Sequence, residues 1–207
     1  MPFSKKDWIE LKLKDIGIDS IPTNLCQITF QGNICIQNLG QIIKPAITKE
    51  EPHLYYRHDP EKLYTAMMID PDAPSRAQSQ PNKNWLHWVK VNIPGSNVNV
   101  GETTVTYVPC GPPKDTGLHR YLILVFEQKK SIYWPKFDWL QKTVENRENF
   151  EISEFVEKFG DKFLTSKEPV SVGCWRAEWD DSVPELYEEL QYNYEAMPRM
   201  LLAQING

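Results

Sequence analysis

The fold of this chain is decided by residues 119–128, which read HRYLILVFEQ. Residues 121–126 are apolar without interruption, so both alternating faces of an extended strand would be apolar here. A strand of this kind is covered on both sides, as the central strand of a sheet is. The sequence therefore predicts that residues 119–128 form the middle of the main sheet.

Further strands are indicated on either side, because several segments combine β-branched or aromatic residues with boundaries of Gly, Pro and Asn. These segments are residues 27–30, 33–37, 62–70, 86–93, 103–108 and 171–179. Apolar residues at helical spacing mark residues 5–16, residues 154–163 and a segment that begins at Ser182. This order predicts a mainly β protein, an antiparallel β-sandwich with a few peripheral α-helices, including one at the C-terminal end.

Composition and charge exclude several broad classes. With 207 residues, 41 % of them hydrophobic and 25 % charged, the chain fits a globular domain with a sizeable core rather than a disordered chain. We expect a single domain at residues 1–190 and a C-terminal extension, residues 191–207, packed on it because of its Met and Leu content. The net charge of −5, without a large cluster of Lys and Arg, argues against nucleic acid as a partner.

Targeting and redox signals favour the cytosol. The longest apolar run, residues 121–126, is far shorter than the roughly 20 residues of a transmembrane helix, so at most peripheral membrane contact is expected. The first residues lack the apolar stretch of a secretory signal. The four cysteines are too few for a disulfide scaffold and are expected to be reduced thiols. We therefore expect a cytoplasmic protein, and a monomer.

Polar residues gather where the apolar strands begin or end. Asp70 ends one strand and opens the segment DPDAPSR, residues 70–76, whose prolines stiffen the chain. Strict alternation points His87 to the same side of its strand as Val89, and His119 opens the central strand. Two carboxylates, two histidines and a Gly-Pro-Pro loop together predict a cavity whose members set each other's protonation.

Several stretches stand out by their order of residues. They are DPDAPSR at residues 70–76, WLHW at 85–88 followed by NIPG at 92–95, and GPP at 111–113 leading to TGLHRY at 116–121. Together they closely resemble the phosphatidylethanolamine-binding protein family, which includes the Raf kinase inhibitor proteins. The likeness runs from about Asp7 to Leu190 and so covers nearly the whole chain.

The resemblance implies a β-sandwich with a small pocket for phosphate-like anions and the phosphatidylethanolamine headgroup, without established turnover. Carried onto matching positions, the ligand-binding residues are Asp70, Asp72, Pro74, Trp85, His87, Gly111, Pro112, His119, Tyr121, Tyr187 and Leu190. The family also implies a cis bond between Ala73 and Pro74. It implies no cofactor, and the protein partners it suggests are protein kinases or other signalling proteins.

The chemistry of these residues fits such a ligand. His87 or His119, hydrogen-bonded to Asp70, would be held in its protonated form near neutral pH and could donate to a phosphate oxygen. The carboxylate of Asp70 or Asp72 and the face of Trp85 suit an ammonium group. We therefore predict a binding and regulatory protein that modulates kinase signalling through protein partners.

Other functions remain open at this point. A phosphoester-processing enzyme could use the Asp and His residues, but Ser75 has no evident base and Cys110 is a weak candidate nucleophile. A zinc site from two His and two Asp lacks a recognised ligand spacing. A serine protease inhibitor role occurs in parts of the family, with no residues to name for it here. We predict no catalytic residue and no bound metal or cofactor.

Overall fold

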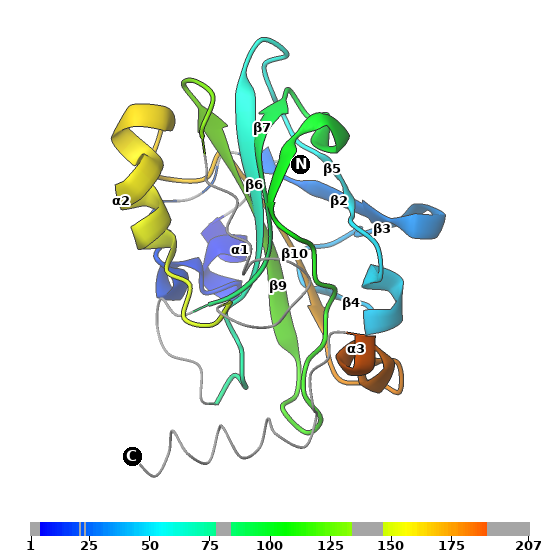
Figure 1. Cartoon of the computed structure of the whole chain (residues 1–207). Helices are drawn as coiled ribbons and strands as arrows, with labels where there is room; N and C mark the ends of the chain where they lie inside the picture. Colours follow the sequence, from blue (N-terminus) through cyan, green and yellow to red (C-terminus); the bar gives the residue numbers. More distant parts are fainter. Residues whose placement is uncertain (1–4, 21, 23, 78–83, 134–146, 190–207) are drawn as a thin grey trace.

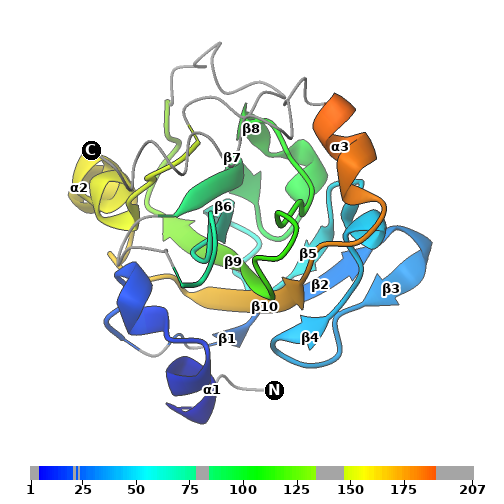
Figure 2. The same cartoon turned by 90° about the horizontal axis from the view of Figure 1, so that it is seen from below.

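The computed structural model describes residues 5–189, apart from residues 21, 23, 78–83 and 134–146. Two β-sheets pack against each other, and the α-helices lie around them (Figure 1, Figure 2). The described part of the chain is therefore mainly β, which confirms the predicted fold class. Leu190 and residues 191–207 lie outside the described residues, so the packed C-terminal extension stays a prediction.

The larger sheet has β9 (His119–Gln128) near its middle. Its order is β1 (Asn24–Leu25), β10 (Ser171–Ala177), β9, β6 (Leu63–Asp70), β7 (Trp85–Pro94) and β8 (Glu102–Val105), with β4 (Gln41–Ile42) also paired to β10. β9 pairs antiparallel with β10 on one side and with β6 on the other, so the predicted central strand is confirmed with the same bounds. The short strands β1 and β4 pair with β10 in parallel, so the sheet is not antiparallel throughout.

The smaller sheet is antiparallel and packs on one face of the larger one. Its strands, in order, are β3 (Ile34–Cys35), β2 (Gln27–Phe30) and β5 (His53–Tyr55). Phe30 of β2 meets Trp175 of β10 edge to face, with ring centroids 5.2 Å apart. The contact shows how the two sheets share one core layer.

The α-helices are short and peripheral. They are α1 (Lys5–Glu10), α2 (Ile152–Phe163) and α3 (Val183–Glu189), and 3₁₀ turns occur at η1 (Leu13–Ile16), η2 (Gln31–Asn33), η3 (Pro45–Thr48) and η4 (Val98–Val100). The single helix predicted for residues 5–16 is wrong, because Lys12 takes a left-handed conformation with φ of 48° and separates α1 from η1. The buried apolar residues of η1 nevertheless reach the core as the periodicity predicted.

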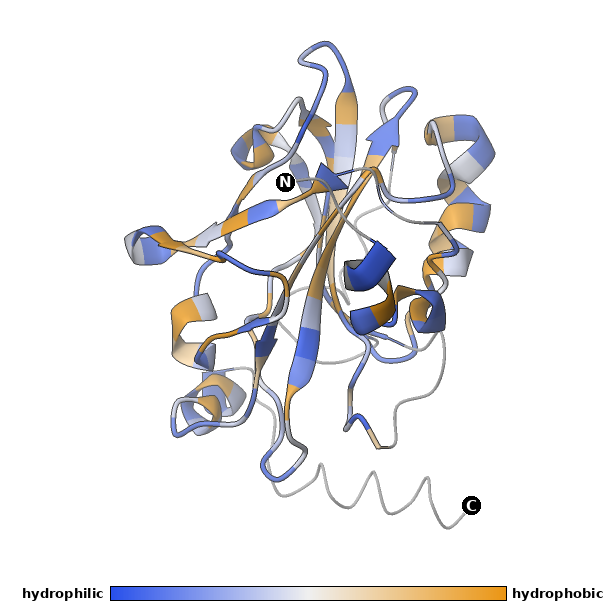
Figure 3. Cartoon of the chain, turned by 180° about the vertical axis from the view of Figure 1, so that it is seen from behind, coloured by the Kyte–Doolittle hydropathy of each residue, from blue (hydrophilic) through white to orange (hydrophobic). Residues whose placement is uncertain are grey.

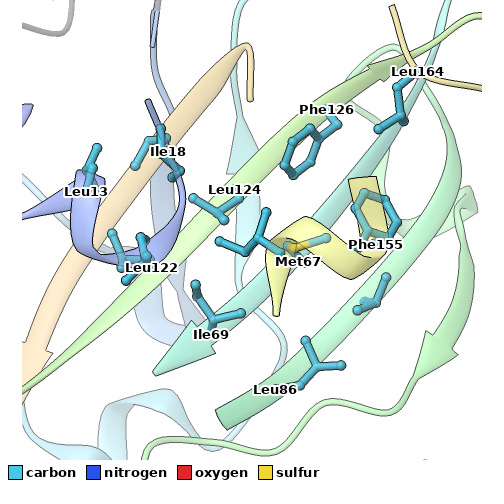
Figure 4. Close-up of a cluster of buried hydrophobic side chains, with 14 of the residues drawn as sticks. Leu13, Ile18, Met67, Ile69, Leu86, Leu122, Leu124, Phe126, Phe155 and Leu164 are labelled. Atoms are coloured by element: carbon cyan, nitrogen blue, oxygen red, sulfur yellow. The ribbon is translucent and has the colours of Figure 1, made fainter. Parts of the chain in front are cut away.

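Strand β9 separates two apolar layers. Leu122, Leu124 and Phe126 face the helical side, where they pack with Met67, Phe155 and their neighbours (Figure 4). Residues 121, 123 and 125 face the smaller sheet and pack with its apolar residues. Coloured by hydropathy, the strands carry much of the apolar character, while many loops are hydrophilic (Figure 3). His119 continues the face that looks toward the smaller sheet.

Strand β7 carries two irregularities that period-two alternation does not show. Met68 of β6 pairs with Trp88, but the next residue, Ile69, pairs with Leu86, so His87 is an extra residue in β7. Such a bulge turns the extra side chain to the side of its neighbour. The prediction that His87 shares a face with Val89 is therefore wrong: Val89 lies in the helical layer, whereas the His87 ring meets Tyr121 on the other side.

Candidate functional site

A buried ion pair joins the end of β6 to the start of β9. Nδ1 of His119 lies 2.7 Å from Oδ2 of Asp70, and the two side chains are 0 % and 5 % exposed. The other carboxylate oxygen of Asp70 accepts the backbone N–H of Asp72 at 2.7 Å. Both oxygens of Asp70 are thus held in place, and the ring of His119 is oriented by one of them.

The second ring nitrogen of His119 contacts the loop before β9. Nε2 lies 2.9 Å from Oγ1 of Thr116, and this hydroxyl donates to the carbonyl oxygen of Pro113 at 2.7 Å. A hydroxyl has one proton to donate, so Thr116 must accept the hydrogen bond from Nε2–H. His119 then carries a proton on both ring nitrogens.

The electrostatic surroundings agree with a charged His119. Burial alone would lower the pKa of His119, but the charge of Asp70 and the hydrogen bond to it outweigh burial and raise the pKa above its ordinary value. Asp70 therefore favours the charged form of His119, and the charge of that form cancels the charge of Asp70. Thr116 is a site residue that the sequence analysis did not single out; its signal is the position three residues before His119.

A hydroxyl, an imidazole and a carboxylate follow one another in Thr116, His119 and Asp70, as in a catalytic triad. The direction of the hydrogen bonds, however, is opposite to the one that a triad requires. A general base must accept the hydroxyl proton, whereas here the hydroxyl proton goes to Pro113 and His119 donates. The arrangement positions the loop at residues 110–117 on the histidine and does not activate Thr116.

His87 has the opposite protonation state. Its Nδ1 lies 2.8 Å from the carbonyl oxygen of Val108, which can only accept, so Nδ1 carries the proton. Burial lowers the pKa of His87 from 6.5 to about 4; the charge of Asp70 opposes this shift, and the charges of Arg147 and His119 add to it. The hypothesis that either histidine is held protonated by Asp70 therefore applies to His119 and is wrong for His87.

Aromatic rings surround His87. Trp85 lies with its ring centroid 4.3 Å from that of His87, and Tyr121 lies 5.2 Å away, both edge to face. The Tyr121 ring also stacks on Trp175 at 5.7 Å. Burial, together with the charge of Asp70, raises the pKa of Tyr121 well above its ordinary value, so its phenol is neutral and can donate. We call Asp70, Trp85, His87, His119 and Tyr121 the histidine site.

Arg147 is a further residue that sequence reasoning missed. It is fully buried and donates to the carbonyl oxygens of Leu86 and His87 at 2.9 and 3.0 Å. Its guanidinium lies 5.5 Å from the Trp85 ring, so the cation–π contact that we expected for a ligand ammonium group is already made within the chain. No local motif around residue 147 marks this role, because only the tertiary fold brings Arg147 to β7.

The Gly-Pro-Pro loop lies against α3. Tyr187 donates its hydroxyl to the carbonyl oxygen of Gly111 at 2.7 Å, and Pro112 is buried. A Cβ atom at Gly111 would lie 2.9 Å from Cδ2 of Leu186 and 3.5 Å from Cε1 of Tyr187, so α3 packs closely on the loop at this glycine. The backbone N–H of Gly111 also donates a hydrogen bond to the hydroxyl of Tyr121. Gly111 and Tyr187 thus lie beside Tyr121 of the histidine site.

Asp72 is turned away from the histidines. Its carboxylate pairs with Arg120, with Nη2 to Oδ1 and Nε to Oδ2 distances of 2.8 Å, and it is fully buried. Burial would raise the pKa of Asp72, but the hydrogen bonds and charge of Arg120 lower it below its ordinary value. Arg120 faces the helical side, opposite His119, and also donates to the carbonyl of Leu11. The structure thus pairs the Asp72 carboxylate with Arg120.

Two predicted ligand-binding residues remain, Pro74 and Leu190. The bond between Ala73 and Pro74 is cis, and Pro74 is partly buried in the turn after β6. Leu190 lies outside the described residues. Among the residues that the structure describes, no group of three or more His, Cys, Asp or Glu is arranged to hold a metal ion. In the same part of the chain, no helix is both long enough and apolar enough to cross a membrane.

Comparison with known families supports the resemblance. Residues 26–168 match the profile of the family described as phosphatidylethanolamine-binding protein. The Drosophila melanogaster protein named "Putative odorant-binding protein A5" is 34 % identical over 173 residues, which cover 84 % of this chain and 79 % of the relative.

A second relative bears on location. The 26 kDa secreted antigen of Toxocara canis is 33 % identical over 142 residues, covering 69 % of this chain and 53 % of the antigen, so the match spans about half of that protein. A secreted and an odorant-binding relative point to an extracellular protein, and the expected cytoplasmic location is therefore wrong.

The architecture also matches a solved structure. Carboxypeptidase Y inhibitor, in its complex with the cognate proteinase, has a TM-score of 0.66 to this chain at 17 % identity, covering 84 % of this chain and 94 % of the inhibitor. This likeness concerns the fold alone.

Proposed function

Because the chain belongs to the phosphatidylethanolamine-binding protein family, we propose that it is a binding protein whose histidine site takes a phosphate-bearing headgroup. The observation that carries this proposal is the buried cation of His119 on Asp70. Asp70 alone would repel an anion, and His119 cancels its charge. The neutral phenol of Tyr121 adds a hydroxyl that can donate to a phosphate oxygen.

A binding role is favoured over an enzymatic one. The names of the relatives describe binding or secretion and no catalysed reaction. Within the site, the hydroxyl of Thr116 gives its proton to Pro113, and burial raises the pKa of the Cys110 thiol, so neither is an activated nucleophile. Retention of a headgroup, rather than its cleavage, fits this chemistry.

The extracellular relatives change the expected partners. Protein kinases act inside cells, so the predicted role in kinase signalling is not supported by the setting that the relatives suggest. A phosphoethanolamine group, free or on a phosphatidylethanolamine surface, requires no intracellular partner. No residue of this chain can be named for protease inhibition, because the likeness to carboxypeptidase Y inhibitor concerns only the fold.

Calorimetric titration with phosphoethanolamine tests the proposal. Replacing His119 by Gln removes the cation and leaves the Asp70 charge facing the anion, so binding should weaken by about 1.5 to 3 kcal/mol. The control variant His53→Gln, at an exposed position of β5, should bind as the native protein does. Vesicles with and without phosphatidylethanolamine distinguish a lipid from a free ligand.

Two results would contradict the proposal. If the native protein binds neither phosphoethanolamine nor inorganic phosphate, the site is not an anion site. If folded His119→Gln binds phosphoethanolamine as tightly as the native protein, the ligand lies elsewhere on the molecule.

A further inference from the structure

Resting on the proposed phosphate-binding function, we propose that the ligand must donate a hydrogen bond to Nε2 of His87, from a P–OH group or from an ammonium group beside the phosphate, so that the site rejects tetrahedral anions that carry no proton. For inorganic phosphate, the form that binds is then the monoanion. It follows from the way β7 and the segment after β8 hold the His87 ring.

The His87 ring is locked in one tautomer by its neighbour across the sheet. The backbone N–H of Val108 donates to the His87 carbonyl at 3.0 Å, and Nδ1–H of His87 donates back to the Val108 carbonyl at 2.8 Å. Moving the proton to Nε2 would leave a lone pair of the ring facing the Val108 oxygen, and that buried carbonyl would lose its donor. The tautomer is therefore determined by the hydrogen bond from Nδ1–H to the Val108 carbonyl, while the backbone hydrogen bond holds Val108 beside His87.

Nε2 of His87 consequently carries no proton and accepts a hydrogen bond, in a direction that the fixed ring determines. Among the described residues it has no hydrogen-bond partner, whereas both nitrogens of His119 are engaged. A neutral imidazole nitrogen without a proton can only accept. An unprotonated sulfate or phosphate oxygen at this position would place two lone pairs against each other, while a P–OH group would donate.

The charged groups around His87 leave its ring neutral at pH 7. Asp70 at the end of β6 favours a proton on His87, and His119 of β9 and Arg147 oppose it; the neutral rings of Trp85 and Tyr121 complete the surroundings. Burial is the largest influence, and the pKa of His87 is lowered to about 4. Protonating His87 to accommodate an unprotonated anion at pH 7 would thus cost a factor on the order of 1,000 in affinity.

Inorganic phosphate and sulfate are the probes, because they share shape and lack an ammonium group that could donate instead. Calorimetric titrations of the full chain between pH 5 and pH 8 should show phosphate bound at least about ten-fold tighter than sulfate at pH 6. Above the second pKa of phosphate, its affinity should fall by about ten-fold per pH unit, as the monoanion disappears. Sulfate should instead gain about ten-fold in affinity per pH unit as the pH falls from 8 to 5, because a larger fraction of His87 takes up a proton.

His87→Gln removes the requirement, since a side-chain amide can donate as well as accept. In this variant the ratio of phosphate to sulfate affinity should approach one. The matched control is His58→Gln, because His58 also places Nδ1 at 2.9 Å from a backbone carbonyl, that of Tyr56, but lies outside the histidine site. It should keep the native ratio.

The outcomes separate the two proposals. Equal, pH-independent binding of phosphate and sulfate by the native protein overturns the inference and leaves the proposed function standing, whereas binding of neither anion overturns both. If His87→Gln does not fold, the native pH profiles still decide, and nitrogen-15 spectra of the native protein give a second measurement. A protonated Nε2 on His87 at pH 7 in those spectra would also overturn the inference.

Discussion

At the scale of single residues, the two histidines differ because one faces a carboxylate and the other a carbonyl. Asp70 stabilises the charged form of His119, and the Val108 carbonyl accepts from His87 without supplying the full charge that would offset burial. Burial therefore decides the pKa of His87 and is outweighed at His119. The two histidines thus supply different groups: His119 a cation and His87 a neutral hydrogen-bond acceptor.

This difference predicts a loss of stability in mild acid. The folded pKa of His87, about 4, lies below its ordinary value of 6.5, so protonation favours the unfolded chain. The stability due to neutral His87 is present above pH 6.5 and is lost as the pH falls toward 4, by about 3 kcal/mol. Urea unfolding at pH 7 and pH 4 should show this loss in the native protein and a smaller loss in His87→Gln. Equal losses would mean that His87 is not buried as a neutral ring.

At the element level, β7 has a second bulge: Tyr64 of β6 pairs with Ile93 and Ala66 with Lys90, so β7 has one residue more than β6 in the stretch that contains Asn92. Asn92 has φ of 57°, and its Oδ1 accepts from the backbone N–H of Ile132 at 2.8 Å and from Nε2 of Gln128 at 2.9 Å. Its Nδ2 donates to Oε1 of Glu102 and to the carbonyl of Ile132, both at 2.9 Å. One side chain therefore joins β7, β8, β9 and the turn after β9.

Replacing Asn92 separates backbone strain from hydrogen bonding. Asn92→Gly keeps the left-handed conformation without strain and loses the side-chain bonds, and we expect the free energy of unfolding to fall by about 2 kcal/mol. Asn92→Ala adds the cost of the left-handed backbone, so its free energy of unfolding should be lower by about a further 1 kcal/mol. Urea unfolding of both variants checks this. Unchanged stability in both would show that this network does not hold the strands together.

At the scale of the whole molecule, the packing of the two sheets depends on a glycine. A Cβ atom at Gly173 in β10 would lie 2.6 Å from Cδ1 of Ile28 and 2.8 Å from the carbonyl oxygen of Cys26. The backbone oxygen cannot move without displacing the chain that enters the smaller sheet. The same core layer contains Trp175 and Tyr121, so the spacing of the sheets also positions the wall of the histidine site.

Alanine at two glycines should therefore have opposite effects. Gly173→Ala overpacks the contact between the sheets and should lower the free energy of unfolding by about 1 to 3 kcal/mol. Gly160→Ala in α2 places the new Cβ in ordinary contact, 3.5 Å from Cγ1 of Val156. This variant should have a free energy of unfolding higher by up to about 1 kcal/mol, because alanine favours a helix over glycine. Thermal unfolding of both variants compares them. A Gly173→Ala protein as stable as the native one would contradict the close packing of the sheets.

Features that depend on short-range periodicity and composition could be predicted from the amino-acid order alone. Apolar residues on both faces of residues 119–128 sufficed to place β9 in the centre of the sheet, and the motifs around Asp70 and His119 sufficed to bring these two residues into one site. A doubly buried strand requires apolar residues on both sides, and this requirement is visible without any partner.

The protonation states and the directions of the side chains depend on long-range packing and could not be predicted in this way. The bulge at His87 arises from the pairing of β7 with β6, so strict alternation along one strand gave the wrong face. Asp72 turns to Arg120, and Arg147 reaches Trp85, through contacts between residues far apart in the chain. Burial and hydrogen-bond partners set a pKa, and both are properties of the packed molecule that no local pattern contains.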